Sequence, residues 1–463
     1  MKIYRNVLEM VGSTPMLEVT RMDTGPCRLF LKLELMNPGG SIKDRIGVAM
    51  IEEAEKRGDI RPGDVLVEAT AGNTGIGLAL AAAQKGYRLI LVLPDKMSQE
   101  KIFNLRAMGA EIVLTRSDVG KGHPEYYQDL AQRIAAEQGA YYVNQFGNPD
   151  NPAAHEQTTG PEIWEQMGHD LDAVVVGVGS SGTITGLSRF FARAAPHVEL
   201  VLADPKGSIL ADYIATGRIG EGGSWLVEGI GEDFLPSISD FSRVKSAFTI
   251  TDGESFSMAR ELLRSEGILA GSSSGTLLAA ALAWCRQQQE PKRVVAFACD
   301  TGNKYLSKLY NDFWMEDQGF IARPEYGDLR DLIGRPHAHR ATITVSPSDV
   351  IITAHNRLRN AGFSQLPVMD DDRLVGVITE DDIIRYTFGR PARMGEPVSC
   401  AMRTSFLKVD KDTSLDNLVA LLHGDSYAAV TADGGDRFLG LITRSDVLNY
   451  LRRLHQRESD ERS

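Results

Sequence analysis

The chain has 463 residues, and its 62 acidic against 50 basic side chains give a formal net charge of −12. A hydrophobic content of 43% and a charged content of 24% are typical of a globular protein and exclude a mostly disordered chain. The acidic balance argues against nucleic acid or an anionic membrane as the main partner. The four cysteines are widely spaced and the first ten residues lack a secretory apolar core, which predicts a cytoplasmic location without disulfides. No cluster of His or Cys suggests a metal site.

Short β-rich runs alternate with helical stretches up to about residue 315. The apolar runs at 64–70, 88–94 and 172–178 are each followed by an amphipathic helical pattern. Continuous apolar strands followed by helices indicate a parallel sheet that is covered on both faces. The sequence therefore predicts an α/β fold for this part of the chain.

The first loop whose residues could take part in binding or catalysis is NPGGSIKDR, at 37–45. Ser41 and Asp44 have the spacing of a capping box, which predicts that a helix begins here with Lys43 in its first turn. A cation is disfavoured near the positive end of the helix dipole, so the pKa of Lys43 should fall toward the neutral amine that forms a Schiff base. For a lysine considered alone, a surface position is the simpler explanation.

The second loop is EATAGNTGIG, at 68–77. Gly72 and Gly75 let backbone N–H groups approach an anion, while Asn73 and Thr74 can hydrogen-bond polar ligand atoms. An ordinary strand-to-helix turn is the alternative interpretation.

The third loop, at 177–186, matches G-x-G-x-x-G between a strand and a helix, and Asp204 follows Gly182 after another apolar run. The same pattern is the dinucleotide-binding fingerprint, so an NAD-dependent dehydrogenase is an alternative at this point. In the fourth loop, at 269–284, Ser273 can offer its hydroxyl to a heteroaromatic nitrogen, unless its serines only cap the helix.

The remaining chain contains an internal repeat. Residues 316–340 are polar and are predicted to form a linker. Adding 64 to a residue number then carries Thr379 onto Thr443 and Asp382 onto Asp446, which predicts two small strand–helix domains at 341–393 and 394–455. Both T-x-x-D motifs also have the spacing of a simple helix cap. The last residues, 456–463, form a charged tail.

Taken together, the four loops resemble the fold-type II pyridoxal-phosphate enzymes of the cysteine synthase/cystathionine β-synthase family. VEGIGEDFLP, NQFGNP and DTGNKYLSKLYNDFWM also resemble that family, so the similarity covers about residues 3–315. The repeat resembles a pair of CBS regulatory domains (a Bateman module), which favours the cystathionine β-synthase branch. The resemblance implies a tryptophan-synthase-β-like, parallel-sheet catalytic core at 1–315, made of two α/β subdomains.

The resemblance also assigns roles to residues. Lys43 would be the catalytic lysine that holds pyridoxal 5′-phosphate. The implied cofactor-binding residues are Lys43, Asn73, Gly179, Ser180, Ser181, Gly182, Thr183 and Ser273. The implied substrate-binding residues are Thr70, Ala71, Gly72, Thr74, Gln145, Gly229 and Glu232. An adenosine ligand such as S-adenosylmethionine would bind at Thr379, Asp382, Thr443 and Asp446.

Three of these positions depart from the family pattern. Ser181 stands where glycine is usual, Ala71 where serine is common, and Glu232 where better-known members carry tyrosine. The last departure makes the second substrate less certain. No haem is expected, because the chain enters the core pattern within its first dozen residues.

The implied reaction condenses L-serine with L-homocysteine to L-cystathionine and water, through a Lys43 aldimine and an aminoacrylate. Release of hydrogen sulfide from cysteine or homocysteine is a further implied activity. A cysteine synthase using O-acetylserine and sulfide is the enzymatic alternative, and a non-catalytic adenosine sensor is another. The family also implies a homodimer or a higher homo-oligomer.

Overall fold

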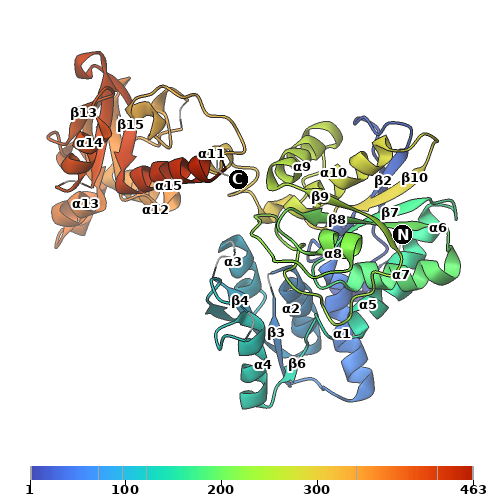
Figure 1. The fold of residues 1–463 in the computed structure, drawn as a ribbon. Helices are drawn as coiled ribbons and strands as arrows, with labels where there is room; N and C mark the ends of the chain where they lie inside the picture. The colour runs from blue at the N-terminus through green and yellow to red at the C-terminus, as the bar shows by residue number, and fades with distance from the viewer. Residues whose placement is uncertain are drawn as a thin grey trace. The chain divides into compact units, whose positions relative to one another are not determined.

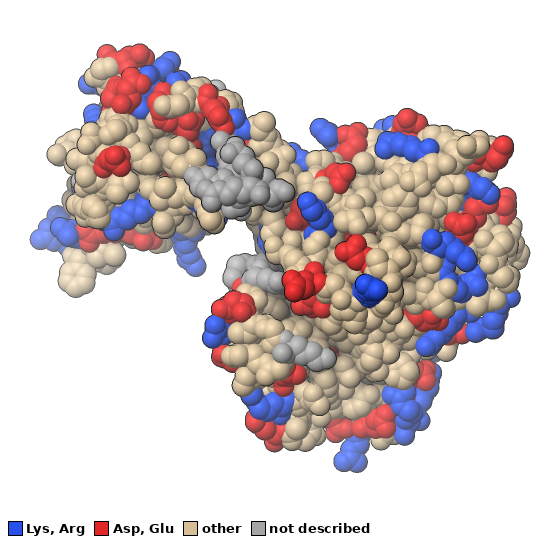
Figure 2. Space-filling model, in the orientation of Figure 1, with Lys and Arg blue, Asp and Glu red and all other residues tan. Residues whose placement is uncertain are grey.

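The computed structural model describes residues 3–70, 72–95, 97, 99–120, 122–339, 341–424 and 426–460. The chain divides into two compact units, Met1–Tyr310 and Asn311–Ser463 (Figure 1). No helix within the described ranges is both long and apolar enough to cross a membrane. On the face drawn in Figure 2, acidic and basic side chains are interspersed on each unit among the described residues, without a large basic area.

The larger sheet of the first unit has the strand order β1-β2-β10-β7-β8-β9. Its strands pair in parallel, except for β1, which is antiparallel to β2. The interiors of β7, β8 and β10 are buried, as the continuous apolar runs predict for a sheet covered on both faces. The strands are β1 (Met16–Glu18), β2 (Arg28–Lys32), β7 (Ala173–Gly177), β8 (Glu199–Pro205), β9 (Val244–Ile250) and β10 (Arg293–Phe297).

The smaller sheet of the same unit has the order β5-β4-β3-β6, and all of its pairs are parallel. Its strands are β3 (Val65–Ala69), β4 (Arg88–Pro94), β5 (Glu111–Thr115) and β6 (Tyr141–Tyr142). A buried cluster that includes Met50, Leu78 and Leu91 packs this sheet against its helices. The first unit is thus built on two parallel sheets, and the α/β prediction is confirmed.

Helices connect these strands (Figure 1). They are α1 (Lys43–Arg57), α2 (Asn73–Lys85), α3 (Gln99–Ala107), α4 (Tyr127–Gln138), α5 (Asp150–Ala154), the π-helix η3 (His155–Thr159), α6 (Gly160–Gln166), α7 (Gly182–Ala194), α8 (Leu210–Thr216), α9 (Asp252–Glu266) and α10 (Ser272–Arg286). The 3₁₀ segments are η1 (Val7–Met10), η2 (Glu34–Met36) and η4 (Gly302–Lys304). The strand–helix alternation read from the sequence is therefore present.

The second unit contains two similar β-hairpins. β11 (Gln365–Asp370) pairs with β12 (Arg373–Thr379), and β14 (Tyr427–Ala432) pairs with β15 (Arg437–Thr443). Each hairpin has a bulge in its second strand, where one extra residue lies opposite the step from Val368 to Met369 or from Val430 to Thr431. The turn is longer in the second hairpin, so the 64-residue repeat holds for β12 and β15 but not for the strands before them.

Helices and short segments complete this unit. They are α11 (Asp312–Asp317), η5 (Leu329–Asp331), η6 (His337–His339), α12 (Ile351–Ala361), α13 (Glu380–Thr387), η7 (Pro391–Gly395), η8 (Val398–Cys400), β13 (Lys408–Asp410), α14 (Leu415–Leu422), η9 (Asp433–Gly435) and α15 (Arg444–Asp460). Leu329, Leu332 and Ile333, from the segment expected to be a linker, are buried with β14 and β15. The predicted domain boundaries stay a prediction.

Candidate active site

A cavity of about 490 Å³ lies in the first unit, a volume typical of small-molecule sites. Most of the residues predicted to bind cofactor or substrate line it. They are Lys43, Thr70, Gly72, Asn73, Thr74, Gln145, Gly179, Ser180, Thr183, Gly229, Glu232 and Ser273. Ser181 and Gly182 belong to the same loop but do not line the cavity, and Ala71 lies outside the described residues.

Lys43 is the first residue of α1, so the prediction that it lies in the first helical turn is confirmed. The predicted capping box is wrong, because Ile42 is the N-cap and no side chain caps the helix. Asp44 instead accepts a hydrogen bond from the Gly39 amide at 2.5 Å, while Ser41 Oγ accepts one from the Lys43 amide at 3.2 Å. The helix begins as expected, but the carboxylate orders the preceding loop.

The pKa of the Lys43 amine is lowered, mainly because burial disfavours the charged form. The sequence predicted a lowered pKa from the helix dipole, whereas desolvation of the Lys43 amine is the largest cause of the shift. The nearby Asp300 and Glu232 oppose it. Lys43 is thus biased toward the neutral amine that nucleophilic chemistry requires.

The close crossing of α1 and α2 brings Lys43 and Asn73 to the same cavity. A Cβ added at Gly47 would lie 2.4 Å from the backbone carbon of Gly77, and one added at Gly77 would lie 2.6 Å from the Lys43 oxygen. The two helices therefore touch backbone to backbone, one turn after Lys43 and Asn73. Only glycine permits this approach.

The side-chain amide of Asn73 is held at both ends. Its Nδ2 donates to Asp300 Oδ2 at 2.7 Å, and its Oδ1 accepts from Lys304 Nζ at 2.9 Å. Lys304 also donates to the Gly39 oxygen at 3.0 Å. Asn73 is therefore fixed in one orientation, and one amide hydrogen is still available to a ligand.

The loop at 70–74 is oriented by Gln145. Thr74 Oγ1 donates to Gln145 Oε1 at 2.6 Å, and Gln145 Nε2 donates to the Ala69 oxygen at 3.0 Å. Glu68 lies behind this pair, and burial raises its pKa to about 8 although the Gln145 amide donates to it. The hydroxyls and amides around this loop suit a small carboxylate.

The glycine-rich loop at 177–183 follows β7 and opens α7. Gly179 approaches Gly229 so closely that an added Cβ would lie 2.6 Å from the Gly229 oxygen. Ser181 has φ of +65°, a left-handed conformation that explains why glycine is usual there. Thr183 Oγ1 lies 3.2 Å from Nε2 of the buried His155, whose Nδ1 lies 2.9 Å from Thr159 Oγ1. The loop is therefore supported from η3.

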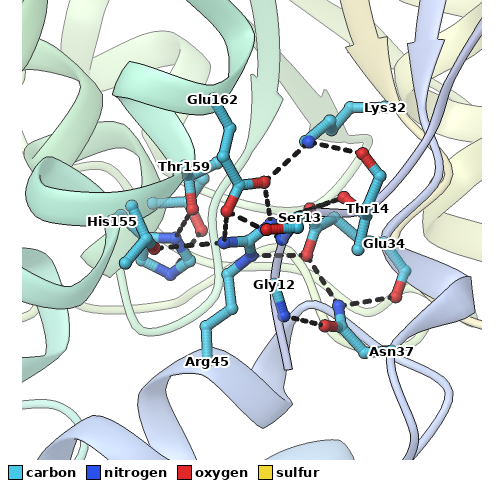
Figure 3. Close-up of polar contacts among 12 residues, drawn as sticks. Gly12, Ser13, Thr14, Lys32, Glu34, Asn37, Arg45, His155, Thr159 and Glu162 are labelled. Carbon is cyan, nitrogen blue, oxygen red and sulfur yellow. Dashed lines mark hydrogen bonds and ion pairs between the residues drawn. The ribbon is translucent and has the colours of Figure 1, made fainter. Parts of the chain in front are cut away.

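A buried polar network anchors α1 next to the cavity (Figure 3). Arg45 donates to Glu34 at 2.8 Å and to Glu162 at 2.7 Å, and Lys32 donates to Glu162 at 2.8 Å. Burial opposes ionisation of Glu162, yet Arg45 and Lys32 lower its pKa to about 2. These ion pairs fix the first turn of α1, which carries Lys43.

Glu232 and Ser273 complete the predicted set. Burial, together with the charges of Asp233 and Asp204, raises the pKa of Glu232 well above its usual value. Its backbone amide and oxygen both bond to Ser208 Oγ, at 3.1 Å. Ser273 is in the first turn of α10 and is buried. Burial thus favours the protonated form of the Glu232 carboxyl, which lines the cavity.

Among the lining residues that were not predicted from the sequence are Lys101, Glu228, Cys299 and Lys308. Burial raises the pKa of the Cys299 thiol to about 12. Glu228 and Lys308 lie within segments that carried the family resemblance, so that resemblance could have singled them out. Lys101 had no such signal, because its partners are more than a hundred residues away.

The second unit has its own cavity, of about 570 Å³, and Thr443 and Asp446 line it. Thr379 and Asp382 do not line it, and Arg403 pairs with the Asp382 carboxylate at 2.5 Å. Thr379 and Asp382 form a complete capping box, and Asp446 Oδ2 likewise accepts from the Thr443 amide at 2.7 Å. Both motifs therefore cap helices, and the second also faces this cavity.

Comparison with known proteins agrees with this geometry. A family model described as a pyridoxal-phosphate dependent enzyme matches residues 7–300, and the CBS domain model matches 330–389 and 398–453. Cystathionine beta-synthase of Dictyostelium discoideum is 37% identical, covering 98% of this chain and 94% of that relative. The chain belongs to the cystathionine beta-synthase family. The Saccharomyces cerevisiae member is 33% identical, covering 96% of this chain and 97% of its own length.

Among solved structures, the O-acetylserine dependent cystathionine beta-synthase from Helicobacter pylori is similar to the first unit. It is 37% identical, with a TM-score of 0.62, and the match covers 66% of this chain and 99% of that one. The fold-type II assignment and the tandem CBS domains are therefore both confirmed.

The cofactor of this family is pyridoxal phosphate, and the cavity fits it. An amine with a lowered pKa lies in the same cavity as the Gly179–Thr183 loop, which opens α7, and backbone N–H groups at a helix N-terminus suit a phosphate. The dehydrogenase alternative fails at Asp204, which is fully buried and accepts a hydrogen bond from the Ala211 amide at 2.8 Å. Asp204 does not line the cavity, so it is not placed to hold a ribose.

Proposed function

We propose that this chain condenses L-serine with L-homocysteine to give L-cystathionine and water. The observation that carries the proposal is the convergence of Lys43, the 70–74 loop and the 177–183 loop on one cavity. Relatives named cystathionine beta-synthase match nearly the whole chain, and this chain also carries the CBS pair. A cysteine synthase is therefore less favoured.

Lys43, Asn73, Gly179 to Thr183 and Ser273 would hold pyridoxal phosphate. When bound, the cofactor supplies a sink for the electron pair left when the substrate loses its α-proton. The Lys43 amine takes that proton and later returns it, and its lowered pKa keeps it able to do both. A serine opposite the ring nitrogen gives a milder sink than a carboxylate would, which suits replacement at the β-carbon.

The first substrate would bind in the cavity between the loop that carries Thr70 and Thr74 and the wall that carries Gly229 and Glu232. Thr70, Gly72, Thr74 and Gln145 would hold the carboxylate of serine, and the role of Ala71 stays a prediction. Gly229 and Glu232 would face the β-carbon. Because burial raises the pKa of Glu232, its carboxyl is the group suited to donate a proton to the departing hydroxyl, which would leave as water.

Borohydride trapping tests the role of Lys43. After loading with pyridoxal phosphate and reduction, we expect the cofactor on the peptide that carries Lys43. The Lys43→Ala variant should lose this adduct and its turnover, while Lys56→Ala, at the exposed end of α1, should retain both. An adduct on another lysine, or turnover by Lys43→Ala at the wild-type rate, would contradict the proposal. No adduct at all would favour the non-catalytic sensor.

O-Acetylserine is a second candidate for the first substrate. The similarity to the Helicobacter pylori enzyme, whose name states O-acetylserine dependence, supports it. Acetate leaves without prior protonation, so this reaction would not need the Glu232 proton. Release of hydrogen sulfide from cysteine or homocysteine is proposed as a side activity of the same site.

We further propose that an adenosine ligand, such as S-adenosylmethionine, binds the second unit. Thr443 and Asp446 line a cavity large enough for it, and CBS domains typically bind such ligands. Arg403 already neutralises Asp382, so the Thr379 and Asp382 site is the poorer candidate.

A homo-oligomeric state and a cytoplasmic location also remain proposals. Ile384 and Phe388, at 59% and 85% exposure on and just after α13, offer apolar surface for a second copy. All four cysteines are free, as a reducing compartment would require.

A further inference from the structure

Three charged side chains meet at the wall of the first cavity, and none of them has a role in the site described so far. Lys101 of α3 lies 2.6 Å from Glu228, and Lys308 lies 2.7 Å from the other oxygen of the same carboxylate. The side chain of Lys101 is 2% exposed, that of Glu228 is 13% exposed and that of Lys308 is 29% exposed. They line the cavity that holds Lys43.

This wall carries an excess of positive charge. Two ammonium groups share one carboxylate, and the two lysines, against the opposing effect of burial, lower the pKa of Glu228, which keeps it ionised. Tyr305, 3.4 Å from Lys101, stays neutral because burial raises its pKa. The wall thus presents two ammonium groups and one carboxylate to the cavity, which suits a ligand that carries both charges.

The wall adjoins the loop that is proposed to hold the first substrate. A Cβ added at Gly72 would lie 2.8 Å from Cδ of Lys101, so the lysine stem lies against this loop. Lys308 approaches the cavity from the segment after η4. Its ammonium has three N–H donors, of which the contact with Glu228 uses one.

We propose that Lys308, with Lys101 and Glu228, binds the charged end of the second substrate, an amino acid that bears a thiol. The lysines take its α-carboxylate and Glu228 takes its α-ammonium. The inference rests on the proposed function and names the residues that select the acceptor. Sulfide has neither an α-carboxylate nor an α-ammonium group, so this wall distinguishes a thiol amino acid from it.

The test compares two thiols at saturating L-serine: L-homocysteine, which has both charges, and 2-mercaptoethanol, which has neither. Lys308→Met should raise the KM for homocysteine by roughly tenfold to a hundredfold, the worth of a charge-assisted hydrogen bond. Its KM for 2-mercaptoethanol should change by less than about twofold. Lys308→Arg should restore most of the homocysteine affinity, and Lys245→Met, at an exposed lysine of β9, should match the wild type.

Equal losses with both thiols in Lys308→Met would assign Lys308 a structural role and overturn the inference. Unchanged kinetics with homocysteine would overturn it as well, while leaving the proposed function intact. A wild-type protein that joins neither thiol to serine would contradict the proposed function and the inference together. Thermal unfolding of each variant checks that the fold is retained.

Discussion

At the scale of single residues, burial shifts the pKa values of Lys43 and Glu232 toward their neutral forms. Burial lowers the pKa of Lys43 and raises the pKa of Glu232. An amine and a carboxyl whose pKa values are shifted toward the neutral form are suited to be the base and the acid that β-replacement of serine needs. The same cause therefore prepares the removal of the α-proton and the departure of the hydroxyl.

Glu68→Gln should make the protein more stable at alkaline pH. The folded-state pKa of Glu68 is about 8, above its ordinary value of 4.5, so its favourable contribution is complete below the ordinary value and is lost as pH rises through about 8. Glutamine keeps an acceptor for the Gln145 amide without a charge. The melting temperature of the variant should exceed that of the wild type by a margin that grows from pH 5 to pH 9.

The matched control is Glu137→Gln, whose side chain is 67% exposed on α4. It should follow the wild type across the same pH range. A Glu68→Gln margin that does not grow with pH would show that Glu68 is already ionised in the folded protein at neutral pH.

The residue scale also separates what the sequence could predict from what it could not. The start of α1 at Lys43 followed from local pattern, because a helix start depends on neighbouring residues. The partner of Asp44 did not, since it depends on how the preceding turn brings Gly39 back to it. Lys101 and Glu228 were missed because their contact requires the two sheets to be assembled first.

At the scale of elements, the site depends on the contact between α1 and α2. Alternating strands and helices were predictable from apolar periodicity, but periodicity does not tell which helices cross. Gly47 and Gly77 decide it, because their missing side chains let the two backbones touch next to Lys43. A glycine inside a helix is therefore a signal of close packing here, although it weakens the helix itself.

Gly77→Ala should separate these helices and disturb the site. The added methyl would lie 2.6 Å from the Lys43 oxygen, and overpacking of this kind costs roughly 1–3 kcal/mol. We expect a lower melting temperature and weaker binding of pyridoxal phosphate, measured by absorbance titration of the apoprotein. Gly220→Ala is the control, since a Cβ there meets nothing within 4 Å. Wild-type cofactor affinity in Gly77→Ala would contradict this account of the crossing.

At the scale of the whole molecule, the repeat makes two sites that are similar in sequence but different in surroundings. Its 64-residue period predicted two small strand–helix domains with a T-x-x-D motif each, and two CBS domains are present, each built on a β-hairpin. It could not predict the asymmetry, because Arg403 occupies the first motif from outside the repeated pattern. At the second motif, Gly334 lies close to Asp446 instead. A Cβ added at Gly334 would lie 2.9 Å from the Asp446 carboxylate.

Asp446→Ala should abolish binding of an adenosine ligand, and Asp382→Ala should leave it. Both substitutions remove the carboxylate of a helix-capping pair, worth about 1 kcal/mol, and Asp382→Ala also removes the ion pair with Arg403, so the control carries the larger structural cost. Calorimetric titration with S-adenosylmethionine, ATP and AMP measures the difference. Loss of binding in both variants, or in Asp382→Ala alone, would contradict the assignment of the ligand to the Asp446 cavity.

The central claim is the identity of the product, and a competition assay tests it directly. Purified, cofactor-loaded protein receives L-serine, L-homocysteine, O-acetylserine and sulfide together, and mass spectrometry follows the products. We predict L-cystathionine as the main product, with its alanyl carbons drawn from labelled serine. Cysteine as the main product would contradict the account and make the chain a cysteine synthase with a CBS pair.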